Sequence, residues 1–214
     1  MISRALRTTT GGQPVVRAVF LDRDGVINRK PPEGQYVTCW EDFHVLSGVA
    51  EGIAQLNRAG FHVVVVTNQR CLAKGLMTVA DLEALHQQMS ESLARAGAIL
   101  DEIYYCPHEM EPTCRCRKPA PGMLLDAARE HGIELSASWM IGDSEIDVEA
   151  GRRAGCKTAR LSTPREGAQE TGCCGGVSSA ADIVAPSLRD AVGQILRQEG
   201  TAIGSLAATP ATQS

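Results

Sequence analysis

Two acidic residues stand two positions apart at the end of an apolar run. Asp22 and Asp24 close the run that begins at Val15, and Gly25 follows them directly. Such a run is typical of a buried strand, whose alternate residues share a face. The two carboxylates would enter one small volume, and their repulsion would be relieved by Mg²⁺, which prefers oxygen ligands. An ordinary turn is the alternative, since Asp and Gly are common turn residues.

Polar residues follow two further apolar runs. Thr67 follows Phe61–Val66, and its hydroxyl could bind phosphate oxygens together with backbone N–H groups, or could cap the turn. The run that ends at Ile141 leads to Asp143 and Asp147, where the alternative is that Asp143 or its neighbour caps the next helix. Four acids at two strand ends favour a metal site over coincidence.

Lys118 lies just before an expected helix, between a Cys-rich segment and two prolines. A lysine in this place could hold a phosphate as a point charge. A solvated surface lysine is the alternative.

Three cysteines and one histidine crowd into one short segment with the spacing Cys-x-His-x₅-Cys-x-Cys. They are Cys106, His108, Cys114 and Cys116. Cys₃His is a standard tetrahedral zinc set, and a closed four-ligand site is structural. We therefore predict a structural Zn²⁺, with a group of reduced thiols as the alternative. The segment runs directly into Arg117 and Lys118, so zinc would rigidify a loop beside the substrate pocket.

Strand and helix patterns alternate along the chain, which predicts an α/β fold with a parallel sheet covered by helices on both faces. The expected strands are Val15–Leu21, Phe61–Thr67, Glu102–Tyr105, Ser138–Ile141, Lys157–Leu161 and Asp182–Val184. The expected helices are Val49–Ala59, Thr78–Ala96, Gly122–His131, Ile146–Ala154 and Ser187–Gln198. We expect one domain over residues 14–199, with flexible ends at 1–13 and 200–214.

Composition limits the class of protein. The 214 residues are 43% hydrophobic and 21% charged, with a net charge of -4, so a nucleic-acid partner has little electrostatic support. No apolar run has the roughly 20 residues needed to cross a bilayer, and the first residues do not form a secretory signal. We expect a cytosolic monomer without a nucleic-acid or membrane partner. Its other cysteines, Cys39, Cys71, Cys156, Cys173 and Cys174, are expected to be ordinary reduced thiols.

Together these motifs resemble those of the haloacid dehalogenase-like phosphohydrolases. The residues that match, in order, are Asp22, Asp24, Thr67, Lys118, Gly142, Asp143 and Asp147. The resemblance spans residues 18 to 161 and implies a three-layer, Rossmann-like sheet that carries an aspartyl-phosphate mechanism. A minimal cap is expected, because no insertion is long enough for a full cap domain.

The resemblance implies a role for each matched residue. Asp22 would attack phosphorus, and Asp24 would act as general acid and then as general base. Thr67 and Lys118 would steady the transferring phosphoryl group.

A magnesium site is also implied. Mg²⁺ would be held by Asp22, Asp143 and the backbone carbonyl of Asp24. Asp147 would lie just outside these ligands and orient Lys118 or a metal-bound water.

Within this family the chain looks like the D,D-heptose 1,7-bisphosphate phosphatase group. Three sequence motifs carry this resemblance. They are the Asp-x-Asp-Gly-x-Ile-Asn motif that ends at Asn28, Thr67-Asn68-Gln69, and Arg117-Lys118-Pro119 after the Cys-Pro-His…Cys-x-Cys segment. The group implies a sugar phosphate substrate, cleaved at C7 to leave heptose 1-phosphate. The related histidinol-phosphate phosphatases, or another small phosphomonoester, are the alternative.

Five residues are expected to bind the substrate: Asn28, Asn68, Gln69, Lys74 and Arg117. Arg117 and Lys74 would hold the second phosphate. Two departures from the group, both expected at the pocket mouth, are the longer and more basic loop from Arg29 to Tyr36 and Cys71, where a small residue is usual.

Two readings outside this class remain. A receiver-like module, phosphorylated on Asp without turnover, also has acids at strand ends. A zinc-stabilised binding protein with an inactive site is the other. The acid–base candidate Asp24 and the zinc segment argue against the first, and the complete set of catalytic positions argues against the second.

Overall fold

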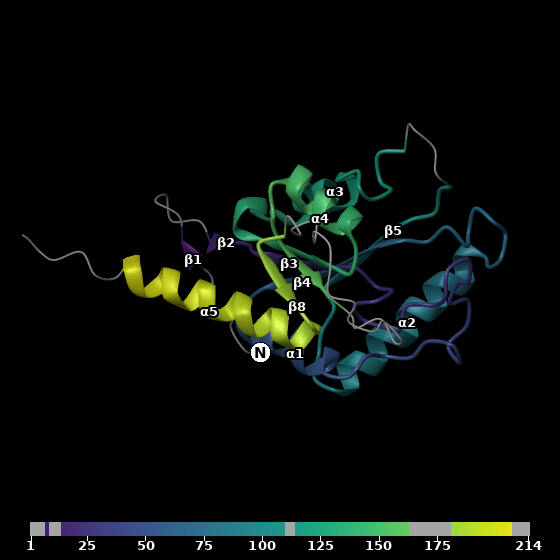
Figure 1. Ribbon diagram of the computed structural model, residues 1–214, viewed down its shortest axis with the longest axis horizontal. Coiled ribbons are helices and arrows are strands. Elements are labelled where there is room, and N and C mark those ends of the chain that lie inside the picture. The colour runs from purple at the N-terminus through teal and green to yellow at the C-terminus, as the bar shows by residue number, and fades with distance from the viewer. Residues whose placement is uncertain (1–6, 9–13, 110–113, 163–180, 207–214) are drawn as a thin grey trace, which may run out of the picture.

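A parallel sheet forms the middle of the molecule (Figure 1). It has six strands in the order β5-β4-β3-β6-β7-β8. The computed structural model describes residues 7–8, 14–109, 114–162 and 181–206. The strands are β3 (Ala18–Leu21), β4 (His62–Asn68), β5 (Glu102–Cys106), β6 (Trp139–Gly142), β7 (Lys157–Leu161) and β8 (Ile183–Ala185). A separate two-stranded antiparallel pair joins β1 (Arg7–Thr8) to β2 (Pro14–Val15).

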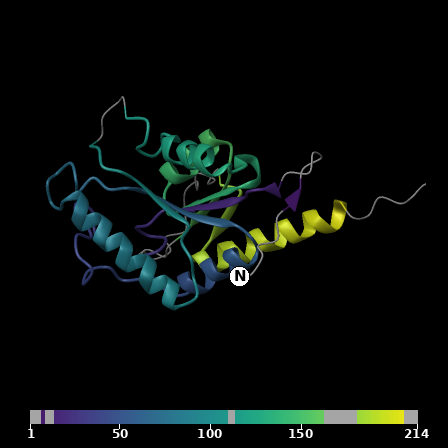
Figure 2. The ribbon, with the colours of Figure 1, turned by 180° about the vertical axis from the view of Figure 1, so that it is seen from behind.

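Helices cover both faces of the sheet, as Figures 1 and 2 show. On one face lie α1 (Val49–Arg58), α2 (Val79–Arg95) and α5 (Leu188–Leu206), and on the other lie α3 (Gly122–His131) and α4 (Glu145–Ala154). Alternate residues of β3 serve the two faces: Val19 packs with the first group, and Phe20 with the second. The predicted three-layer α/β architecture is confirmed.

Two helix starts are capped in the way that their sequences predict. The Thr78 hydroxyl accepts a hydrogen bond from the Asp81 amide, and Asp81 accepts one from the Thr78 amide. Ser144 and Asp147 form the equivalent pair at the start of α4. These capping boxes satisfy amide groups that a helix leaves unpaired at its N-terminus.

One predicted strand was wrong in extent. The run from Val15 to Leu21 divides, because Val15 belongs to the antiparallel pair and only Ala18–Leu21 enter the main sheet. Arg17 separates the two parts: its guanidinium stacks 4.2 Å from the centre of the Phe61 ring and pairs with Glu199 at 2.9 Å. The apolar run therefore contains a buried cation that anchors α5.

The other predicted elements are present, and most of their ends agree within one residue. The exception is α5, which continues to Leu206 and so includes the first residues of the tail expected to be flexible. Residues 1–6, 9–13 and 207–214, where the remaining predictions of flexibility fall, lie outside the described residues. No helix in the described part of the chain is long and apolar enough to cross a membrane.

The chain order creates a crevice at one edge of the sheet. From β3 the chain proceeds outward to β4 and β5, then returns to β6 on the opposite side of β3. Parallel sheets bind ligands where such connections diverge, beyond the carboxyl ends of the strands. Leu21 pairs with both Val65 and Ile141, so the residues that follow these three strands meet at one edge.

The described loops at this edge are short of secondary structure. In their described residues, the loops after β3, β4 and β5 contain no helix and no sheet of several strands. These described loops border the site, and the minimal cap stays a prediction.

Candidate active site

A buried lysine is the centre of the crevice. The Lys118 side chain is 1% exposed, and its Nζ lies 2.8 Å from Asp22 Oδ1 and 2.7 Å from Asp147 Oδ1. The same nitrogen donates to the Val66 carbonyl at 2.8 Å. An ammonium has three N–H donors, so these three acceptors saturate it. Strands β3 and β4 and the start of α4 are thereby joined through one side chain.

Lys118 and the acids beside it shift one another's pKa values. Burial alone would lower the pKa of Lys118, but the carboxylates of Asp147 and Asp22 raise it. Burial raises the pKa of Asp22 to about 7, although Lys118 acts in the opposite direction. The ionisation of Asp22 is therefore balanced near neutral pH and responds to any further cation.

Carboxylate oxygens of Asp22, Asp143 and Asp147 come within 4.8 Å of one another. Asp143 Oδ1 is buried without a hydrogen-bond partner, while Oδ2 pairs with Lys30 Nζ at 2.6 Å. Burial raises the pKa of Asp143, against the effect of the Lys30 ammonium. Hard oxygen donors with an orphaned buried oxygen fit Mg²⁺, which neutralises such groups.

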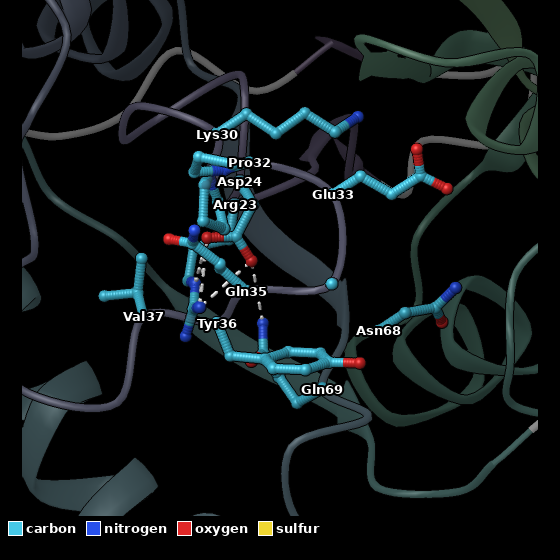
Figure 3. A pocket seen from close by; sticks show the side chains of 12 residues that line it. Arg23, Asp24, Lys30, Pro32, Glu33, Gln35, Tyr36, Val37, Asn68 and Gln69 are labelled. Carbon is cyan, nitrogen blue, oxygen red and sulfur yellow. Dashed lines mark hydrogen bonds and ion pairs between the residues drawn. The ribbon is translucent and has the colours of Figure 1, made fainter.

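Asp24 lies next to Asp22 in the sequence motif but has different partners. Its carboxylate accepts from the Arg23 guanidinium at 3.0 and 3.1 Å and from Gln69 Nε2 at 3.1 Å (Figure 3). It also accepts from Asn28 Nδ2 at 2.9 Å. Burial alone would raise the pKa of Asp24, but Arg23 and the hydrogen bonds from Asn28 and Gln69 lower it. The two acids of the motif are thus held in opposite electrostatic environments.

Several residues expected to bind substrate form hydrogen bonds with the catalytic candidates. Asn28 is 0% exposed and bonds to Asp24. Asn68 accepts from the Lys118 amide and donates to the Lys118 carbonyl, both at 3.1 Å. Gln69 also donates to the Thr67 hydroxyl oxygen at 2.8 Å. Of these, Asn68 and Gln69 also line the adjoining pocket, which has a volume of about 220 Å³.

The cations expected to hold a second phosphate lie further out. Neither Lys74 nor Arg117 lines that pocket, and the charges of both lower the pKa of Glu109, after the larger effect of Arg70. Arg70 pairs with Glu109 at 2.8 Å, which joins the loop after β4 to the loop after β5. These residues form a charged rim beside the pocket.

Besides Arg70 of the charged rim, sequence reasoning missed three contributors to the site. Arg23 stands between the two acids of the motif, and its position next to them was the available signal. Lys30 belongs to a loop whose basic character is visible in the sequence, but only the folded chain brings it to Asp143. Tyr36, from the same loop, lines the pocket opposite Lys30 (Figure 3).

The Cys₃His segment converges as predicted. His108 Nδ1 lies 3.3 Å from the Sγ atoms of both Cys114 and Cys116, and Cys106 Sγ lies 3.6 Å from Cys114 Sγ. Four ligands at the zinc–sulfur distance would be separated by about 3.8 Å in a tetrahedron. The cluster is therefore close to the dimensions that a tetrahedral zinc ion requires.

The other cysteines lie apart from this cluster. Cys39, Cys71 and Cys156 are free thiols, and Cys173 and Cys174 fall outside the described residues. Cys71 was expected at the pocket mouth, but it is 0% exposed and donates to Gln69 Oε1 at 3.6 Å. It packs behind the pocket wall because the loop after β4 turns its side chain into the core.

Gly25 makes a test of the carboxylate site possible. A Cβ at Gly25 would collide with the Asp143 carboxylate. We expect Gly25→Ala to displace Asp143 and to weaken Mg²⁺ binding on the order of tenfold or more, measured by isothermal titration calorimetry.

Gly34→Ala is the matched control. Both glycines have positive φ, 93° and 81°, but a Cβ at Gly34 meets nothing within 4 Å. Gly34→Ala should bind Mg²⁺ as the unaltered protein does. An equal loss of Mg²⁺ affinity in both variants would show that backbone strain, and not the collision with Asp143, weakens binding.

Comparison with known proteins agrees with this geometry. A family model described as HAD-hydrolase-like matches residues 115–191. The D-glycero-beta-D-manno-heptose-1,7-bisphosphate 7-phosphatase of Rhodopseudomonas palustris is 42% identical over 153 residues, which cover 68% of this chain and 83% of that protein. The enzyme of the same name from Escherichia coli is 38% identical over 197 residues, covering 86% of this chain and 96% of the relative.

A solved structure gives the same result for the fold. The D,D-heptose 1,7-bisphosphate phosphatase of B. bronchiseptica, crystallised with magnesium and phosphate, superposes with a TM-score of 0.73 at 34% identity. The match covers 86% of this chain and 99% of that one. With this similarity in sequence and fold, the chain belongs to the D-glycero-β-D-manno-heptose-1,7-bisphosphate 7-phosphatase family of the HAD-like hydrolases.

Proposed function

We propose that this protein is a Mg²⁺-dependent phosphatase that removes the C7 phosphate of D-glycero-β-D-manno-heptose 1,7-bisphosphate and releases heptose 1-phosphate. The observation that carries the proposal is the Asp22–Lys118–Asp147 arrangement beside Asp143 at the crevice of the sheet, in a chain of this family. We assign the activity to a single domain over residues 14–199.

Asp22, Asp143 and the backbone carbonyl of Asp24 would hold the magnesium ion. The donor set fits, since Asp143 has a buried oxygen without a hydrogen-bond partner. The pKa of Asp22 is raised to about 7 by burial, so a bound cation would favour its ionised form. When bound, Mg²⁺ would offset negative charge on the transferring phosphoryl group. Asp147 is already satisfied by Lys118 and by the cap of α4, so its proposed role is to orient Lys118.

Asp22 is the proposed nucleophile. Lys118 and the Arg23 amide both contact Asp22 Oδ1, which fixes the carboxylate. A carboxylate oxygen would form a bond to phosphorus while the ester P–O bond breaks, and the electron pair would go to the sugar oxygen. Lys118 and the Thr67 hydroxyl would hold the phosphoryl oxygens in place during this displacement.

Asp24 is the proposed acid and base. Protonated, it would give its proton to the departing C7 oxygen; ionised, it would take a proton from the water that releases phosphate from Asp22. In the free site Arg23 keeps the pKa of Asp24 low, but a phosphate dianion beside it would raise the pKa again. Asn28 and Gln69 hold this carboxyl where both proton transfers occur.

The charged rim is the proposed site of the second phosphate. Arg117, Lys74 and the additional Arg70 are its cations, and Glu109 offsets part of their charge. An anionic group at the far end of the sugar would replace Glu109 as their partner. This would favour a bisphosphate over a substrate with one phosphate.

Zinc is proposed at Cys106, His108, Cys114 and Cys116, in a structural role. The cluster lies between β5 and Lys118, and the Arg117 amide donates to Cys114 Sγ at 3.3 Å. A metal that fixes this loop would also fix Arg117, and with Asn68 it would set the position of Lys118.

Replacement of the nucleophile tests the chemistry. We expect Asp22→Asn to lower kcat by at least about ten-thousandfold, because the amide cannot attack phosphorus, while the circular dichroism spectrum and bound zinc are unchanged. Phosphate release in the presence of Mg²⁺ measures the effect. Retained turnover would contradict the proposal, and a stable aspartyl phosphate without turnover in the unaltered protein would indicate a receiver-like module instead.

The substrate is tested by direct comparison. We expect kcat/KM for D-glycero-β-D-manno-heptose 1,7-bisphosphate to exceed that for histidinol phosphate by about a hundredfold or more, since only the bisphosphate can engage the charged rim. Steady-state kinetics with both substrates decides the question. A preference for histidinol phosphate would assign the protein to the related activity.

The zinc site has its own test. We expect the purified protein to contain zinc by elemental analysis and Cys114→Ser to lose it, with kcat/KM reduced on the order of tenfold as the loop before Lys118 loosens. Cys39→Ser, at an exposed thiol outside the cluster, is the control and should retain zinc. Zinc-free protein of normal activity would leave the cluster as a group of thiols.

A further inference from the structure

A second lysine, Lys30, forms an ion pair with Asp143. Lys30 Nζ lies 2.6 Å from Asp143 Oδ2, and the Lys30 side chain is 56% exposed while that of Asp143 is 6% exposed. We propose that Lys30 is an exchangeable counter-ion: it pairs with Asp143, is displaced when Mg²⁺ binds, and then binds a phosphate oxygen of the substrate. This inference rests on the proposed function, because it takes Asp143 as a metal ligand.

The first step of the argument is that Asp143 requires a cation that Lys118 cannot supply. The three N–H donors of Lys118 are directed to Val66, Asp22 and Asp147. A buried carboxylate without a partner is costly, and two other acids lie within 4.8 Å. In the described structure, Lys30 is the cation that forms an ion pair with Asp143.

The second step is that the backbone of the preceding residue, Arg29, is anchored, whereas the Lys30 side chain is largely exposed. The Arg29 amide donates to the His44 carbonyl at 2.8 Å, and the Arg29 carbonyl accepts from Asn28 at 2.9 Å. Only the long aliphatic side chain carries the ammonium to Asp143. Because the Lys30 ammonium is largely exposed, water can take over its hydrogen bonds when a divalent ion replaces it beside Asp143.

The third step is that the displaced ammonium has a place to go. Lys30 lines the same pocket as Asp24, Asn68 and Gln69, and it lies across the pocket from Gln69 (Figure 3). Rotation about its side-chain bonds would bring Nζ from Asp143 into the space that the substrate would fill. In the exchange, the two positive charges of Mg²⁺ replace the single charge of the Lys30 ammonium beside Asp143. The ammonium is then available to bind the phosphate dianion.

Calorimetric titration of the substrate-free protein with Mg²⁺ tests the exchange, at about pH 8, where carboxyl groups are ionised. We expect Lys30→Met to bind Mg²⁺ about three- to tenfold more tightly than the unaltered protein, because no internal cation competes. Lys30→Arg should stay within about twofold, since it keeps the charge. Arg29→Gln, which removes a positive charge from the adjacent exposed residue, should also stay within about twofold.

Kinetics at saturating Mg²⁺ test the second half. Lys30→Met should raise KM for the bisphosphate about threefold or more with kcat little changed, because a contact with the bound phosphate is lost. Equal or weaker Mg²⁺ binding in Lys30→Met, or tightening of the same size in Arg29→Gln, would overturn the exchange, and an unchanged KM would overturn the phosphate contact. Absence of Mg²⁺ binding in every variant would instead contradict the proposed metal site.

Discussion

The saturated ammonium of Lys118 is the constraint on which the site depends. It is held between Asp22 and Asp147 and fixed to the Val66 carbonyl, so it ties together residues from β3, β4 and the start of α4. A buried charge of this kind is tolerated only when every donor has an acceptor. Its position therefore requires the parallel register of β3 with β4 and β6.

Surplus negative charge follows from this arrangement. Lys118 compensates Asp22 and Asp147 but has no donor left for Asp143, whose partner is the more exposed Lys30. Burial raises the pKa values of both Asp22 and Asp143, against the effects of Lys118 and Lys30. A site of this charge is suited to a divalent ion, and the loops around it supply the removable and fixed cations that a phosphate ester needs.

The motif acids illustrate how identical side chains acquire different roles. Asp22 faces a lysine and other acids, whereas Asp24 faces the Arg23 fork and two amide side chains. Burial acts on both, but only Asp24 has enough donors to reverse its effect on the pKa. Environments that separate the pKa values of neighbouring acids are the usual basis for dividing nucleophile from acid–base.

The sequence by itself determined the alternation of strands and helices, the acids at the strand ends, and the Cys₃His set, because periodicity and ligand spacing are local properties. It could not show that Arg17 divides the first apolar run, that Asn28 is wholly buried beneath Asp24, or that Cys71 faces the core. Nor could it join Lys30 to Asp143 or Arg70 to Glu109, which are 113 and 39 residues apart. Those contacts exist only after the switch in strand order brings separate loops to one edge, since electrostatic pairing depends on distance in space and not on distance along the chain.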